Sequence, residues 1–446
     1  MKKQIKKGMT AVLAGAMLLS LAACGSKDEA GKPVEIRIVT SERSKMDFYQ
    51  KEADKFNSEN DQNIQVVFDF KADNIEELIK TGYTSNNAPD IHTSMSGAMD
   101  ELAIKDGWFR EIPDDLRDEW IDTYGSSKVV YHGDKAYNLR TAQKGCPGYK
   151  LLWNKDLFKE AGLNPEEPPK TWDELREDAK KITEIGGGKK FGYVMPFKDA
   201  IFTRYYVIIP SAVSGFYNAD GYDPVKGEYD FSVYAPLIEK YREIIADGSV
   251  FPSPYTTDND TARAQFAEGN IGMICAAGWD VDVYSEQFVV NDDWGITEYP
   301  TMDGEVRGGY PYGVGVGTVY YMSASSKHPD EQLAVYKWFL SLQEDPAKKE
   351  SKKGFKEFSE YKFPVAKSDA VDTPSNLLKL EQDDCWTMLK NLILSDGDVK
   401  EGLQQITDTY NAALQKAIDA GADINEYKVD ADFSFYADNE DGLVKR

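Results

Sequence analysis

Two residue periods alternate along the chain after its N-terminal apolar run. Residues 34–38 carry apolar side chains at every second position, which is the period of a β-strand, and residues 64–70 repeat it. Between these segments, the apolar side chains of Tyr49, Ala53 and Phe56 recur at the spacing of one helix face. Strand, helix and strand in this order are typical of parallel strands joined by a crossover helix. The sequence therefore predicts a doubly wound α/β unit.

The length of the chain requires more than one such unit. It has 446 residues, whereas a single hydrophobic core stops growing at roughly 250 to 300 residues, so we predict two cores. A content of 41% hydrophobic and 29% charged residues excludes a disordered chain and a polytopic membrane protein. With 76 acidic against 52 basic residues the formal charge is -24. Such a chain repels phosphate backbones, which excludes nucleic acid as a partner.

The N-terminus is typical of an exported protein. Four lysines precede an apolar run, residues 9–23, which is shorter than the roughly 20 residues of a membrane-spanning helix. The run ends on small residues and Cys24 and so resembles the bacterial lipobox, whose cysteine becomes the first residue and carries a diacylglycerol. We expect removal of residues 1–23, lipidation at Cys24, and a flexible tether over residues 24–32. The alternative is an ordinary signal peptide with an incidental cysteine.

The remaining cysteines are Cys146, Cys275 and Cys385. Three thiols allow one disulfide at most, which excludes a disulfide framework. We expect them to be buried as small apolar side chains, so that packing stabilises the fold.

Helix boundaries can be assigned at two places. Thr171 and Glu174 have the spacing of a capping box at the start of an apolar helical pattern, and the glycines at 186–188 end it. Apolar residues at helical spacing over 399–414, followed by Gly421, predict a second long helix.

The motifs of common enzyme classes are missing from the sequence. No serine lies in a GxSxG motif, no HExxH motif occurs, and His92, His132 and His328 lie far apart. The glycine series over 313–317 has the wrong spacing for a dinucleotide fingerprint. Neighbouring carboxylates are expected by chance in a chain with 76 acidic residues. We therefore expect a protein without catalytic activity, metal or cofactor.

Aromatic residues in predicted loops indicate a different kind of chemistry. Trp279 is followed by Asp280, Tyr310 and Tyr312 lie in a glycine-rich loop, and Trp386 begins an apolar segment. A pyranose has an apolar C–H face that stacks on aromatic rings and a rim of hydroxyls that hydrogen-bonds to planar polar groups. These residues predict a sugar site, although tryptophans are also common in cores.

Five short strings resemble the extracellular solute-binding proteins of bacterial ABC importers, in the sugar-binding family that includes the maltose-binding type. They are NAPDI (87–91), LWNKDLF (152–158), PKTWDEL (169–175), the F..G..GM....GW pattern (266–279) and the WG….P pattern (294–300). The strings occur in the family's order and span most of the chain.

The resemblance implies two α/β lobes with a hinge and a ligand cleft between them. Its implied boundaries are 33–143 plus 300–362 for the N-terminal lobe and 144–299 plus 363–446 for the C-terminal lobe. Trp279 and Trp386 match positions where relatives carry aromatic residues at the sugar. Polar ligand contacts are implied at Glu42, Arg43, Gln143, Asp199 and Arg204.

The function implied is a monomeric, lipid-anchored receptor at the cell surface. It would bind an oligosaccharide and deliver it to the membrane permease of an ABC importer. Three alternatives remain open from the sequence. They are a receptor for polyamines or other cations, since aromatic boxes with carboxylates hold ammonium groups, a surface glycosidase, and a sensor that signals to a membrane kinase.

Overall fold

The structure is a computed structural model that describes most of the chain. The described residues are 32–71, 75–95, 97–143, 148–215, 219–309, 317–359, 373–381 and 383–430. The predictions for residues 1–31, Cys146, Tyr310 and Tyr312 fall outside these ranges. Within them, no helix combines the length and the apolar character needed to cross a bilayer.

The first half of the molecule is built on a mixed sheet. Among the described residues the sheet has six strands, with β1 parallel to β2 and β3, and β12 antiparallel to β3 and β5. In sheet order the strands are β2 (Ile64–Phe70), β1 (Val34–Thr40), β3 (Ile91–Thr93), β12 (Val319–Met322), β5 (Lys135–Arg140) and β4 (Val129–His132). The helices of this half are α1 (Met46–Glu59), α2 (Ile75–Thr84), α3 (Gly97–Lys105), α4 (Asp114–Tyr124) and α11 (Pro329–Ser341).

Helices cover both faces of this sheet, as the doubly wound prediction requires. Ile36 and Ile38 of β1 face a buried cluster that includes side chains of α1, α4 and α11. On the other face, Tyr321 of β12 packs with Ala103 of α3 and with Phe109. The parallel pairing predicted for β1 and β2 is confirmed, and β3 is also parallel to β1. The antiparallel β12 comes from a segment far along the chain, and no local pattern could have placed it there.

The second half is built on another mixed sheet. Its described strands are, in sheet order, β11 (Trp294–Thr297), β6 (Tyr149–Asn154), β10 (Ile271–Ala277) and β7 (Phe191–Tyr193), with a separate ribbon of β8 (Tyr222–Asp223) and β9 (Glu228–Tyr229). Leu151 and Trp153 face one buried cluster and Leu152 faces another, so helices again cover both faces. The helices of this half are α5 (Lys155–Glu160), α6 (Trp172–Gly186), α7 (Ala200–Ser214), α8 (Ala235–Ala246), α9 (Asn259–Ala267), α10 (Asp280–Asp282), α12 (Pro346–Glu350), α13 (Phe355–Ser359), α14 (Cys385–Ile393) and α15 (Val399–Asp419).

Helix α6 shows how local signals fix one element of this half. The capping box predicted at Thr171 and Glu174 is present, and Gly187 ends the helix in the left-handed conformation. Gly192 of β7 lets the helix approach the sheet closely, because a Cβ atom there would lie 2.1 Å from Cα of Ala179. The predicted helix over 399–414 is also confirmed, as α15.

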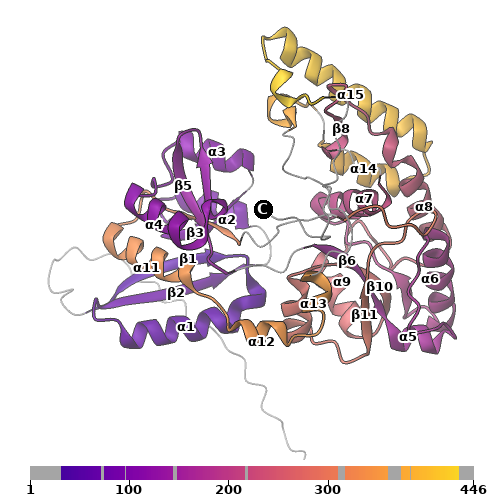
Figure 1. The fold of residues 1–446 in the computed structure, drawn as a ribbon, viewed down its shortest axis with the longest axis horizontal. Helices are drawn as coiled ribbons and strands as arrows, with labels where there is room; N and C mark the ends of the chain where they lie inside the picture. The colour runs from indigo at the N-terminus through magenta and orange to yellow at the C-terminus, as the bar shows by residue number, and fades with distance from the viewer. Residues whose placement is uncertain are drawn as a thin grey trace, which may run out of the picture.

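Ala142 packs in the first half and Tyr149 in the second, and Val306 packs in the second half and Tyr320 in the first. After Leu342, which packs in the first half, Phe355 packs in the second, so the two halves are connected at three places. These segments lie together, since Ala142 N–H donates to Leu340 O at 2.7 Å and Thr141 N–H donates to Thr318 O at 2.9 Å. Figure 1 shows the indigo N-terminal segment and the orange α11 in one half, and the magenta and yellow segments in the other.

The packing near these passages differs from the predicted lobe boundaries at 300 and 362. Met302 and Val306 pack against the core of the second half, and Phe358 is buried within that half.

Two thiols lie in the same half. Cys275 and Cys385 are buried and unpaired, and burial raises the pKa of the Cys275 thiol to about 12. They are apolar packing groups, as expected.

Candidate ligand-binding site

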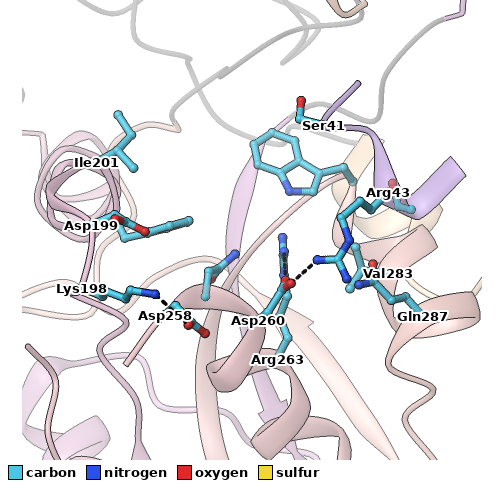
Figure 2. A pocket seen from close by; sticks show the side chains of 14 residues that line it. Ser41, Arg43, Lys198, Asp199, Ile201, Asp258, Asp260, Arg263, Val283 and Gln287 are labelled. Atoms are coloured by element: carbon cyan, nitrogen blue, oxygen red, sulfur yellow. Dashed lines mark hydrogen bonds and ion pairs between the residues drawn. The ribbon is translucent and has the colours of Figure 1, made fainter. Parts of the chain in front are cut away.

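A cavity of about 530 Å³ lies between the two halves. Figure 2 shows its side chains, which come from the loop after β1 in the first half and from several elements of the second. The residues that line it are Ser41, Arg43, Ser44, Lys198, Asp199, Ile201, Phe202, Asp258, Asn259, Asp260, Arg263, Trp279, Val283 and Gln287. Segments more than 200 positions apart in the sequence therefore form one site.

Trp279 provides the aromatic surface of the cavity. It follows β10 and is 39% exposed, an unusually open position for the largest apolar side chain. Its ring packs edge-on against Tyr149 at 5.3 Å between centroids, and Tyr149 stacks on Tyr205 at 4.7 Å. These rings fix the orientation of the indole while leaving part of it open to the cavity.

Asp280 points into the protein and does not line the cavity. Its Oδ1 accepts from Arg263, and its Oδ2 accepts from the backbone N–H of Ala277 at 2.7 Å. Burial raises the pKa of Asp280, and the Arg263 guanidinium opposes that rise. The carboxylate therefore holds Arg263 and the end of β10 in place. Asp280, predicted beside Trp279 as part of a sugar site, is not among the residues that line the cavity.

The cationic groups of the cavity are paired with carboxylates. Arg43, from the first half, forms an ion pair with Asp260 of α9, and Arg263 reaches the same carboxylate at 3.3 Å (Figure 2). Lys198 lies 3.3 Å from Asp258. The arginines and the lysine that line the cavity thus face carboxylates, and the Arg43–Asp260 pair joins the two halves directly.

Two acidic residues lie at helix starts beside the cavity. Asp258 caps α9, since its Oδ1 accepts from Thr261 N–H at 2.8 Å, and hydrogen bonds from Thr261 lower the pKa of Asp258. Asp199 precedes α7 but makes no side-chain capping hydrogen bond to that helix. Its carboxylate lines the cavity and can accept hydrogen bonds from a ligand there.

Glu42 is engaged within the first half. Lys45 forms an ion pair with it, and the hydroxyls of Tyr49 and Tyr320 donate to its carboxylate at 2.9 and 2.8 Å. Burial alone would raise the pKa of Glu42, but these partners together hold it below its usual value. The carboxylate supports the loop that carries Arg43.

Three other residues with implied ligand contacts lie outside the cavity lining. Gln143 is buried, and its Nε2 donates to Glu344 at 2.6 Å. Arg204 forms an ion pair with Asp220 at 3.1 Å and lies over the ring of Trp386 at 5.8 Å. The structure thus brings together Trp279, Arg43 and Asp199 at the cavity, whereas Gln143, Arg204 and Trp386 lie elsewhere.

The comparison with known proteins identifies the family. A model of the family described as bacterial extracellular solute-binding protein matches residues 40–345, which is more than half of the chain. The chain belongs to this family. Members of the family are binding proteins, and the resemblance seen in the sequence is confirmed.

Relatives and solved structures agree with this assignment. The solute-binding protein is 28% identical to the galactooligosaccharide-binding protein of Bacillus subtilis (strain 168), over 83% of each chain. It is 25% identical to the sn-glycerol-3-phosphate-binding periplasmic protein of Escherichia coli (strain K12), over 68% of this chain and 69% of that one. The maltose/maltodextrin-binding domain of Bdellovibrio bacteriovorus, solved with maltotriose, superposes with a TM-score of 0.60 over 86% of this chain and 100% of that one, at 17% identity. The predicted two-lobed α/β fold is confirmed.

Sequence reasoning missed several lining residues of this solute-binding protein. The largest group is Lys198, Asp258, Asn259, Asp260 and Arg263. A signal was present, because the run 258–260 offers three side chains with hydrogen-bonding groups directly before the apolar Ala262 and Phe266 of α9. Polar residues at the start of a helix are common caps, so the run alone does not separate a capping role from a binding role.

Proposed function

We propose that this protein binds an uncharged oligosaccharide in the cavity between its halves and delivers it to the permease of an ABC importer. The observation that carries this proposal is the open indole of Trp279 beside a polar cavity whose cations are paired with carboxylates. The names of relatives support it, since the protein from Bacillus subtilis is a galactooligosaccharide-binding protein and the structure from Bdellovibrio bacteriovorus holds maltotriose.

The lining side chains match the two surfaces of a sugar. The C–H face of a pyranose stacks on the indole of Trp279, and the hydroxyls reach Asp199, Asn259 and Gln287, which offer planar acceptors and donors. A cavity of about 530 Å³ is of the size that holds small ligands in proteins. Rotation of the halves about the connecting segments would then close the site over the sugar.

The pairing of charges favours a neutral ligand over an anionic or a cationic one. A phosphate ester would need an uncommitted cation, but Arg43 and Arg263 both face Asp260. An ammonium group would need an uncommitted carboxylate, and Asp258 faces Lys198. A charged ligand would have to compete with these existing partners for the same groups, whereas the hydroxyls of a neutral sugar would not. Asp199 alone is a weak basis for a polyamine site.

The ligand class is tested by a panel titration of the purified exported chain. Thermal shift is measured with galacto-, malto-, xylo- and raffinose-type oligosaccharides, and with spermidine and sn-glycerol 3-phosphate in parallel. Ligand that binds only the folded state raises the melting temperature, so we expect a rise with at least one neutral glycan, followed by micromolar affinity in calorimetry. A rise with spermidine or with the phosphate ester, and with none of the glycans, would contradict the proposal.

Absence of turnover is part of the same proposal. Labelled glycan that binds is incubated with the protein for a day and separated by chromatography. We expect it to be recovered unchanged. The appearance of a shorter product would make the protein a glycosidase.

Anchoring is proposed from the sequence of residues 1–32. Export, removal of residues 1–23 and lipidation of Cys24 would hold a monomer at the membrane surface on a short tether. The test compares the unmodified gene with Cys24→Ala in a bacterial host. We expect the unmodified protein in the membrane fraction and the variant in the medium or periplasm. Equal membrane retention of both would refute lipid anchoring at this cysteine.

A further inference from the structure

A buried cation lies beside the segment that carries the exposed tryptophan. Lys352 follows the last described passage between the halves, and its side chain is 8% exposed. It lies between α12 and α13, which belong to the part of the chain that returns to the second half. None of the family strings includes this lysine, and it does not line the cavity.

The backbone next to Lys352 packs closely against side chains of the second half. Gly354 has a φ of 92°, and a Cβ atom there would lie 2.7 Å from Cδ1 of Ile296 and 3.1 Å from the indole of Trp294. Phe358 of α13 is buried in the cluster that includes Trp294. Lys352 therefore extends from a segment that is packed against the core of the second half.

Its ammonium group is surrounded by carboxylates from two places. Nζ lies 2.6 Å from Asp282 and 2.9 Å from Glu286, both in the turn that follows Trp279. It lies 3.7 Å from Glu344, in the passage between the halves. Burial alone would lower the pKa of Lys352, but these carboxylates hold it above its usual value, so the group is charged.

The turn that Lys352 contacts has two roles in the site. Trp279, Val283 and Gln287 of this turn line the cavity, and the same turn contacts residues 43–45 of the first half. It contains a single π-helical turn, Val283–Gln287, a form that is rare and often found at functional sites.

Glu344 connects this group to another passage between the halves. Its second oxygen, Oε2, accepts from Gln143 at 2.6 Å, and Gln143 is the last described residue before the chain enters the second half. The side chains of Asp282, Glu344 and Lys352 are each less than 10% exposed. A continuous polar chain thus runs from the turn at the cavity to the segments about which the halves would rotate.

We propose that Lys352 is a positioning residue that holds the turn 279–287, and with it the sugar-stacking surface of Trp279, against the segments that join the two halves. Without the cation, Asp282, Glu286 and Glu344 would be three like charges close together, two of them buried, and they would separate. The turn would then lose its fixed position at the cavity. The expected loss of affinity rests on the proposed function, whereas the expected loosening of the turn does not.

The chain offers a matched control for this lysine. Lys353 is its neighbour and also forms an ion pair, at 2.7 Å from Asp293, but both side chains are more than half exposed. Lys352→Met and Lys353→Met both remove a charge while keeping a long apolar stem. Hydrogen exchange of the unliganded exported chain is measured for both variants, and the affinity for the glycan found in the panel is measured by calorimetry.

We expect the amides of 280–288 to exchange at least tenfold faster in Lys352→Met and within twofold of the unmodified rate in Lys353→Met. We expect glycan affinity to fall at least fivefold in the first variant only, and Lys352→Arg to restore most of it. The same loss should shrink in a Trp279→Ala background, because coupled residues are not additive. A purely structural role would lower the melting temperature without any of these effects.

Several results would refute the proposed role of Lys352. Unchanged exchange at 280–288 in a folded Lys352→Met variant would refute it, as would a rise spread evenly over the second half. If that variant does not fold, Asp282→Asn removes the carboxylate charge 2.6 Å from Nζ, while Glu286 still faces the lysine. Exchange should then rise about threefold, and no rise would count against the proposal. Failure of every glycan to bind would refute the proposed function and leave the exchange result as an independent test.

Discussion

Replacing Trp279 by alanine tests the role of the exposed indole. The side chain is 39% exposed, and a tryptophan side chain offers roughly 250 Å² in total, so about 100 Å² is open to a ligand. At about 25 cal/mol per Å², covering all of it contributes about 2.5 kcal/mol, and covering one ring face contributes about half as much. Since about 1.4 kcal/mol is a factor of ten in affinity, Trp279→Ala should weaken glycan binding between about 8-fold and 70-fold.

The assay is isothermal titration of the glycan that gives the largest thermal shift. Tyr255→Ala is the control, because Tyr255 is another exposed aromatic residue of the second half, 48% exposed, that does not line the cavity. Its affinity should stay within twofold of the unmodified value, and Trp279→Phe should lie between the alanine variant and the unmodified protein. A folded Trp279→Ala protein with unchanged affinity would show that the sugar does not stack on this ring, and the ligand-binding role of the cavity would have to be reassigned.

Three further predictions concern pH, interlobe contact and capping. Burial, opposed by a hydrogen bond to Thr93 O, lowers the pKa of His92 to about 4. The pKa of this histidine in the unfolded chain is about 6.5, so between pH 6.5 and pH 4 only the unfolded chain gains the proton. The free energy of unfolding should therefore fall by about 3 kcal/mol as the pH drops through this window. Urea titrations should show a smaller fall in His92→Gln, and equal falls would contradict the assignment. Arg43→Gln removes the ion pair with Asp260, whose two side chains are 33% and 35% exposed, so it should cost less than about 1 kcal/mol of stability. It should nevertheless increase the radius of gyration of the unliganded protein in small-angle scattering, and an unchanged radius would show that this pair does not hold the halves together. Thr171→Ala removes the cap of α6 and should lower the free energy of unfolding by about 1 kcal/mol in urea, whereas an unchanged midpoint would mean that the cap contributes nothing.

The sequence predicted the elements well where neighbouring residues decide the outcome. The alternation at 34–38 and 64–70 corresponds to β1 and β2, and the capping box at Thr171 begins α6 at the expected residue. These signals are local, because a strand period or a cap depends on side chains within a few positions of one another. Trp279 was selected as an aromatic residue in a predicted loop, and the structure places it in the lining of the cavity.

Other features of the site were beyond the reach of local patterns. Asp280 and Asp199 read alike in the sequence, as acidic residues next to apolar segments, yet one is buried against Arg263 and the other lines the cavity. Glu42 was expected at the ligand because of its position after β1, but Tyr320, 278 residues away, donates to its carboxylate. Whether a charged group meets a ligand or a protein partner depends on which distant segments fold against it.

The amino-acid order alone determined the α/β class, the presence of two cores, the export signal pattern and the family strings. Only the folded chain decided that Arg43 meets Asp260 across the cavity and that Lys352 joins the turn after Trp279 to Glu344. The physical reason is the separation along the chain over which each kind of interaction acts. Backbone periodicity and capping are set within one or two turns of the chain, whereas charge pairing and burial are set by distances of a few ångströms between residues that can be hundreds of positions apart.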